Sequence, residues 1–225
     1  MRGVAVPHPA LRATFPPGEG VDIPLAFAAV LAYNKSKEKE GASMKAWQHF
    51  KTITHHRWLV RRGCFQVGLY WQGLTHDLSK YTPTEFMVGA RHFQGVRSPN
   101  AAEREEKGYS ESWMHHKGRN RHHFEYWTDM NPATRRYEAV PMPRKYLAEK
   151  VMDRIAACKT YQKEKYTDGS ALNYFQGSAV EPLMHPQTRR ELTYLLTMLR
   201  DEGEEKTFHY IKNHVLKGKP FPWEE

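Results

Sequence analysis

The sequence predicts an all-α fold. Apolar residues recur at helical spacing through most of the chain, and residues typical of helix starts and ends bound these stretches. No strand-like alternation of useful length and no internal repeat interrupts the pattern. With 225 residues, of which 40% are hydrophobic, the chain can fill the core of one compact domain, which we place at residues 44–218.

The two ends of the chain differ from this domain. Five prolines and three glycines fall within the first 24 residues, and these residue types leave little room for regular structure. We therefore expect residues 1–43 to form a poorly ordered N-terminal tail. Residues 219–225 are expected to form a short C-terminal tail.

Helix signals then follow in order along the chain. Residues 44–74 predict two consecutive helices, because glycines at 63, 68 and 73 mark a break or close packing. Thr82 is a candidate N-cap, Pro83 suits the first helical position, and Glu85 stands at the capping-box position. We expect this helix to end at about Gln94, before Gly95.

The remaining helices are predicted from similar signals. Short helices are expected at residues 98–108 and 110–116, and a longer one from Pro143 to about Tyr166. After a loop rich in Gly, Ser and Asn, two final helices are expected at residues 186–200 and 204–216, separated by Gly203.

Composition narrows the function. The two cysteines form no C-x-x-C pair, which argues against a disulfide framework and a thiolate zinc site. The longest apolar stretch, residues 23–33, is too short to span a membrane, and no secretory leader is recognisable. We therefore expect a cytoplasmic protein without membrane contact. The net charge of +9 allows a nucleic-acid partner, but the charges of both signs are mixed as on a solvated surface, so this partner is not favoured.

Histidine abundance is the compositional anomaly, with 13 in the chain. The adjacent pair His76-Asp77 closes an apolar helical stretch and offers a nitrogen and an oxygen ligand to one metal, or a carboxylate that bridges two. His56 lies on an otherwise apolar helix face, where it is either a core histidine or a ligand. Asp153 lies within an apolar helix, where a buried carboxylate needs a cation or hydrogen-bond donors. It could equally be exposed and paired with a neighbouring cation.

A dense cluster lies between them, in His115-His116-Lys117-Gly118-Arg119-Asn120-Arg121-His122-His123. Four histidines in nine positions favour metal or substrate binding. The sequence does not decide which histidine of each adjacent pair is a ligand. The candidate metal ligands are His56, His76, Asp77, His116, His122, His123 and Asp153.

In this order the residues resemble the HD superfamily of helical metal-dependent phosphohydrolases, in which a His is followed by a His-Asp pair and a late Asp. The segment from Met44 to about Leu216 is also similar to a bacterial and phage family of unknown function, through residues 73–81 (GLTHDLSKY) and 120–123 (NRHH). The resemblance implies an HD-domain-like helical bundle around a central metal site with one or two divalent ions, Mn, Fe, Ni, Zn or Mg. Candidate ligands between His116 and His123 are more closely spaced than is usual for two-metal members, which leaves the second ion open.

The implied activity is hydrolysis of a small phosphorylated substrate, a phosphate ester such as a nucleotide, by metal-activated water. Lys80 matches the lysine that often follows the His-Asp pair and faces substrate phosphate, and Asp77 and Glu125 complete the catalytic candidates. Candidate substrate-binding residues are Arg119, Asn120, Arg97 and Trp127. Two alternatives stay open: a di-iron oxygenase-like enzyme on the same scaffold, and a non-enzymatic, metal-stabilised nucleic-acid-binding protein.

Overall fold

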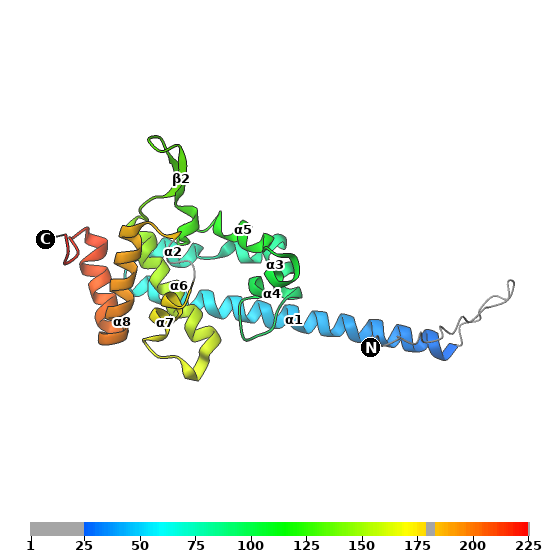
Figure 1. Ribbon diagram of the computed structural model, residues 1–225. Coiled ribbons are helices and arrows are strands. Elements are labelled where there is room, and N and C mark those ends of the chain that lie inside the picture. Colours follow the sequence, from blue (N-terminus) through cyan, green and yellow to red (C-terminus); the bar gives the residue numbers. More distant parts are fainter. Residues whose placement is uncertain (1–24, 179–182, 225) are drawn as a thin grey trace, which may run out of the picture. The chain divides into compact units, whose positions relative to one another are not determined.

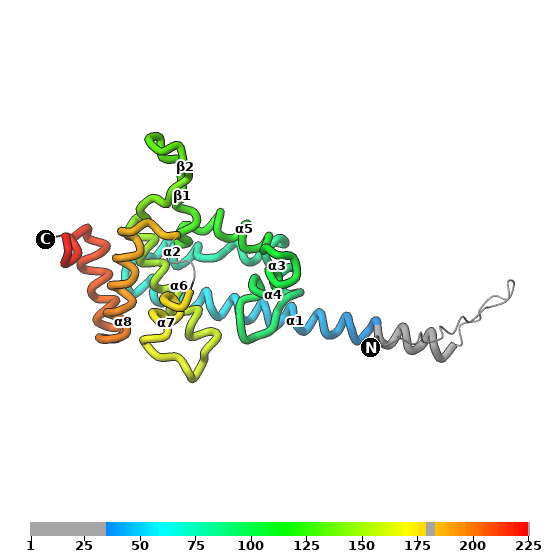
Figure 2. The backbone as a smooth tube through the Cα atoms, viewed as in Figure 1, coloured from blue at the N-terminus to red at the C-terminus, as the bar shows by residue number. Residues whose placement is uncertain are grey.

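The computed structural model describes residues 25–178 and 183–224, with side chains from residue 35 onward, and Figures 1 and 2 trace the backbone. The described residues are mostly helical, as predicted, with eight α-helices and one two-stranded sheet. The chain divides into two units, Met1–Glu40 and Gly41–Glu225. All of the candidate site residues belong to the second unit.

Helix α1, Leu25–Gln66, begins well before the predicted domain start at residue 44. The expectation of an irregular tail is therefore wrong for residues 25–43, while residues 1–24 lie outside the described residues. Pro24 is the last proline before this helix, and the Ala, Leu, Lys and Glu residues that follow favour helix strongly enough to tolerate Gly41. The break between the two predicted helices falls at Gly68, whose φ is 87°, and α2 follows at Tyr70–Thr75.

Three short helices come next, after the 3-10 turn η1 at Leu78–Tyr81. They are α3 at Pro83–Arg91, which ends earlier than expected, α4 at Pro99–Lys107 and α5 at Glu111–Lys117. Thr82 is the N-cap of α3, but its hydroxyl donates to the carbonyl of Ser79 at 2.7 Å rather than capping the helix. Glu85 does not complete a capping box either, because its carboxylate contacts two histidines described below.

A β-hairpin, which the sequence did not predict, separates α5 from the later helices. After the 3-10 turn η2 at Phe124–Tyr126, strand β1 at Thr128–Asn131 pairs antiparallel with β2 at Arg136–Ala139. In Figure 1 the hairpin extends away from the helices. Strands of four residues are too short to show an alternating pattern. The turn is stabilised locally, because the Asn131 side chain accepts from the backbone N–H of Ala133 at 2.9 Å.

Helix α6, Arg144–Gln162, lies at the centre of the second unit and is buried on most of its surface. The 3-10 turn η3 at Lys163–Lys165 and helix α7 at Ser170–Gln176 follow. Helix α7 occupies the segment expected to be a loop. Helix α8, Pro186–Asn213, is interrupted at Gly203, where φ is 82° and ψ is 174°, as the two predicted helices required. The 3-10 turn η5 at Val215–Lys217 ends the helical part.

The predicted C-terminal tail is instead packed onto the core. Phe221 is completely buried, and the guanidinium of Arg144 donates to the carbonyl of Lys219 and to the carboxylate of Glu224 at 3.0 Å. An aromatic side chain stabilises the fold most when fully buried, and this holds residues 219–224 against α6 and α8. Across residues 25–178 and 183–224, no helix combines the length and apolar character needed to cross a membrane.

Candidate metal centre

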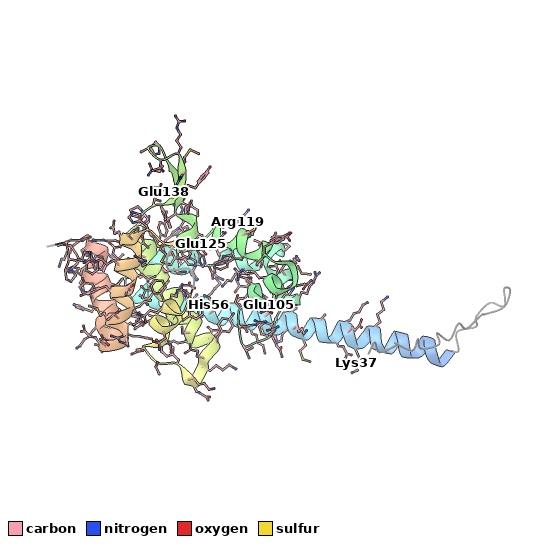
Figure 3. All side chains as sticks on the ribbon, in the orientation of Figure 1. Lys37, His56, Glu105, Arg119, Glu125 and Glu138 are labelled. Atoms are coloured by element: carbon pink, nitrogen blue, oxygen red, sulfur yellow. The ribbon has the colours of Figure 1, made fainter. Side chains whose placement is uncertain are left out.

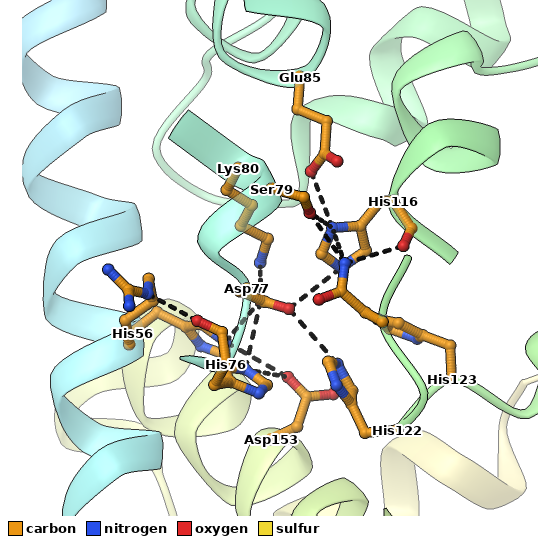
Figure 4. Close-up of polar contacts among 12 residues, drawn as sticks. His56, His76, Asp77, Ser79, Lys80, Glu85, His116, His122, His123 and Asp153 are labelled. Atoms are coloured by element: carbon orange, nitrogen blue, oxygen red, sulfur yellow. Dashed lines mark hydrogen bonds and ion pairs between the residues drawn. The ribbon is translucent and has the colours of Figure 1, made fainter. Parts of the chain in front are cut away.

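Seven side chains that are distant in sequence converge beside α6, as Figure 4 shows. They come from α1, from the end of α2, from the last turn of α5, from the loop before η2 and from α6. These are the seven candidate ligands His56, His76, Asp77, His116, His122, His123 and Asp153.

The backbone at the His-Asp pair turns both side chains into this cluster. His76 terminates α2, and Asp77 takes the left-handed conformation with φ 52° and ψ 27°. Aspartate tolerates this conformation better than most residues with a Cβ atom. The guanidinium of Arg57 donates from Nε to the carbonyl of His76 at 2.7 Å and from Nη2 to that of Leu74 at 3.1 Å. These bonds satisfy carbonyl groups at the end of α2 and fix the turn.

A first group of donors lies on one side of Asp77. His56 Nε2 lies 3.3 Å from Asp153 Oδ1 and 3.6 Å from Asp77 Oδ2. His76 Nε2 lies 3.3 Å from the same oxygen of Asp77 and 3.8 Å from Asp153 Oδ1. One donor atom from each of these four residues falls within 4.8 Å of all the others, so the group could hold one metal ion.

A second group lies on the other side of Asp77. His116 Nε2 and His122 Nε2 lie 3.3 Å and 3.5 Å from Asp77 Oδ1. Together with His123 these residues also place one donor atom each within 4.8 Å of the others. The close spacing of His116, His122 and His123 in the sequence is therefore compatible with one site, because α5 ends between them and the following turn brings the rings together.

Asp77 joins the two groups, with Oδ2 toward the first and Oδ1 toward the second. Both its oxygens are buried, as are the Nε2 atoms of His56, His76, His122 and His123, and none of these four ring nitrogens has a hydrogen-bond partner among the described residues. Buried polar atoms are normally satisfied, and donors that converge in this way are compatible with a bound cation. Imidazole and carboxylate groups suit Zn, Mn, Fe and Ni. The residues present therefore fit a metal ion.

Two glutamates hold the histidine rings from behind. The Oε1 atom of Glu149 on α6 lies 2.8 Å from His76 Nδ1 and 3.2 Å from His122 Nδ1, so one oxygen contacts a ring from each group. Glu85 on α3 contacts His116 Nδ1 at 2.8 Å with one oxygen and His115 Nδ1 at 2.6 Å with the other. A carboxylate on Nδ1 fixes the ring so that Nε2 can bind a metal.

Neither glutamate was predicted to support the histidines. Glu149 precedes Asp153 by four residues, and residues at this spacing lie on the same face of a helix, so this signal was present. For Glu85 no such signal existed, since the capping-box pattern gave it a different role.

The site carries a buried negative charge. Burial opposes ionisation of Asp77, but His76, Lys80 and His116 more than offset this and hold the pKa of its carboxyl well below the usual range. The pKa of Asp153 is also held well below its usual range, because His56 and Lys150 outweigh its burial. Burial lowers and the neighbouring carboxylates raise the pKa of His76, which reaches about 9. Both aspartates are therefore ionised and available to a cation.

Two lysines lie beside the aspartates. The ammonium of Lys80 lies 2.7 Å from Asp77 Oδ2, and its side chain remains partly exposed. Lys150 is buried on α6, with its ammonium 3.6 Å from Asp153 Oδ2 and 3.4 Å from His123 Nδ1. Lys80 thus lies at the edge of the first group, and its partly exposed ammonium could also contact an anion that enters from solvent.

Asn120, which was predicted to bind substrate, lies next to the second group. It is buried, and its amide donates to the carbonyl of His116 and to the hydroxyl of Ser79, each at 2.8 Å. These bonds fix the turn that follows α5. Asn120 therefore orients the second group from within the protein.

The other predicted residues surround the cluster without joining either donor group. Glu125 is partly buried, and its Oε2 has no hydrogen-bond partner in the described structure. Trp127 packs against the core and donates from its indole to the carbonyl of Arg121 at 2.7 Å. Within the described structure, no hydrogen bond, ion pair or ring contact joins either side chain to a candidate ligand.

The two arginines that were predicted to hold an anion lie at the surface. Arg119 is exposed and donates to the carbonyl of His115 at 3.4 Å. Arg97 forms a two-point ion pair at 2.6 Å with Glu105, an exposed residue that is labelled in Figure 3. Among the described contacts, nothing links Arg97 to the histidine cluster.

Comparison with known proteins gives one finding. Residues 45–198 match the family described as a family of unknown function, DUF5662. The match covers more than half of the chain, so the chain belongs to this family. No curated protein and no solved structure matches it.

Proposed function

We propose that this member of the family is a metal-dependent phosphohydrolase that acts on a phosphate ester. The observation that carries the proposal is the position of Asp77, whose two carboxylate oxygens face two separate groups of donors. An aspartate placed in this way can bridge two divalent ions. Order and identity of the ligands also resemble the HD superfamily, which supports an HD-like assignment of the helical domain.

The chain would hold the ions through the two groups defined above. His56, His76 and Asp153 would bind one ion, His116, His122 and His123 the other, and Asp77 both. Metal ions bound there would lower the pKa of a water molecule and offset negative charge on a phosphoryl group. The carboxylates of Glu149 and Glu85 would hold the histidine rings in place. A fixed arrangement of charges is what stabilises a transition state.

Lys80 supports hydrolysis of a phosphate ester over oxidation. Its ammonium lies at the edge of the first donor group and its side chain reaches solvent. From this position it can contact an anionic oxygen of a bound ester without being a metal ligand, and so stabilise charge that develops during reaction. An oxygenase acting on an uncharged substrate would gain nothing from this cation.

Purification without chelators, followed by elemental analysis and a panel of phosphomonoesters, phosphodiesters and nucleotides, tests the proposal. We expect divalent metal in the wild-type protein and turnover of at least one ester. Asp77→Asn should lose metal and turnover, because a neutral amide cannot bridge two cations. The variant should keep its helical fold. His209→Ala, which changes an exposed histidine of α8, is the matched control.

Two results would contradict the proposal. Full metal content and turnover in Asp77→Asn would remove the central residue from the chemistry. Iron with visible absorbance, together with no hydrolysis of any ester, would instead favour the di-iron oxidation reading.

A further inference from the structure

One face of α1, on the side of the helix opposite His56, carries a row of exposed side chains. They recur every three or four residues, which places them on one side of the helix, and we call them the outer stripe. The outer stripe consists of Trp47, Lys51, Thr54, Trp58, Arg61 and Phe65, all exposed. At 1.5 Å per residue it runs for about 27 Å, and aromatic rings alternate with cations along it.

The segment that carries the outer stripe contains no acidic residue. Between residues 41 and 76 there is neither Asp nor Glu, while five cations occur, Lys45, Lys51, Arg57, Arg61 and Arg62. Elsewhere in the chain both signs are mixed. Glu204 of α8 lines a small hollow together with Arg62. Every charged side chain of this segment is therefore a cation, if the histidines are neutral.

Cations and rings along this face are in contact with each other. The Lys51 ammonium lies 5.8 Å from the centre of the Trp47 ring, and the Arg62 guanidinium lies 4.8 Å from that of Trp58. Helix α2 extends the aromatic surface, because Tyr70 packs edge-on against Phe65 with ring centres 5.3 Å apart. Tryptophan and tyrosine side chains left in solvent at this density are unusual for a surface without a partner.

We propose that the outer stripe binds single-stranded nucleic acid. Aromatic faces stack on bases without regard to sequence, and interleaved cations neutralise phosphates, which is the combination that single-strand binding surfaces use. The acid-free segment supplies the charge complementarity. Binding by the outer stripe does not depend on the proposed hydrolysis, because the stripe contains none of the candidate metal ligands.

The same features disfavour two other occupants. An anionic membrane would require a continuous apolar stripe to insert, whereas here Lys51, Thr54 and Arg61 interrupt the rings. A second copy of the chain could pair along a stripe with this spacing. Such a pair would place Lys51 and Arg61 against like charges, which is destabilising.

The test uses the full chain and a fluorescent oligothymidylate of about 20 nucleotides, followed by fluorescence anisotropy. We expect binding that weakens steeply between about 50 and 200 mM salt. Trp58→Ala should raise the Kd about tenfold, as loss of one stacked base would, while Trp58→Phe should restore most of the affinity. Arg61→Ser should weaken binding and reduce the salt slope by about 0.7.

Lys217→Ser, which removes an exposed cation near the end of the chain, should leave the Kd unchanged and so controls for net charge. Circular dichroism of every variant checks that the fold is retained. Equal Kd values for wild type, Trp58→Ala and Arg61→Ser would overturn the proposal. So would binding to phosphatidylserine vesicles but not to the oligonucleotide, or a dimer in sedimentation that Trp58→Ala dissociates. None of these results would bear on metal content or ester hydrolysis.

Discussion

Glu149 offers the sharpest test of the two-group arrangement. Its Oε1 atom lies within hydrogen-bond distance of His76 in the first group and of His122 in the second, at 2.8 and 3.2 Å. Glu149→Gln keeps the size of the side chain but removes the charge. Loss of such a supporting carboxylate typically weakens metal binding 10- to 100-fold, which is about 1.4 to 2.7 kcal/mol for each ion. Because one oxygen serves both rings, both ions should be affected.

Titration with Mn²⁺, followed by electron paramagnetic resonance and by competition with a chelator, measures the two affinities. Glu85→Gln should weaken only the ion held by His116, since Glu85 contacts no ring of the first group in the described structure. Glu138→Gln, on the hairpin and well separated from His56 in Figure 3, should change neither affinity. An unchanged pair of affinities in Glu149→Gln, or loss confined to one ion, would refute the shared role of this carboxylate.

Three further predictions concern separate features. Lys80→Ala should keep its metal content, but its turnover of the active ester in steady-state kinetics should fall by about 10²- to 10³-fold. Unchanged turnover would show that Lys80 has no role in the reaction. Burial, with a contribution from Lys80, lowers the pKa of His49 to about 4. Because the unfolded chain takes up this proton near pH 6.5, the free energy of unfolding should fall between pH 6.5 and 4, by at most about 1.4 kcal/mol per pH unit. Chemical denaturation of His49→Leu should show a shallower loss over this range, and an identical slope would contradict the assignment. Phe221→Ala should reduce the free energy of unfolding by about 3 to 5 kcal/mol, and a value below about 1 kcal/mol would show that the C-terminal segment is not part of the core.

The helical class and most helix positions followed from the sequence because local signals determine them. Pro83, Pro99 and Pro186 each begin a helix, and Gly203 interrupts one, as proline at the first position and glycine with positive φ require. Errors arose where a signal was absent or too short. The hairpin strands have four residues each, and no proline after Pro24 stops α1.

Much of the candidate site could be predicted because its ligands are chemically distinctive. The seven predicted metal ligands fall into the two donor groups around Asp77. Their supporting residues could not be found in the same way. Glu85 and Asn120 act through contacts with residues 31 and 4 positions away, respectively, and a glutamate after a proline reads first as a helix cap. The substrate-binding roles of Arg97 and Arg119 stay predictions, since both side chains lie at the surface.

The division of the candidate ligands among distant segments would link metal binding to folding. Donors to the proposed ions come from residues as far apart as His56 and Asp153, so an unfolded chain cannot present either complete group. Any ion that binds only the native state stabilises it through mass action, by about 2.7 kcal/mol when the free ion is present at 100 times its Kd. The fraction of folded protein would then depend on the concentration of free metal around it. A shortage of that metal would lower the amount of folded protein, whether or not substrate is present.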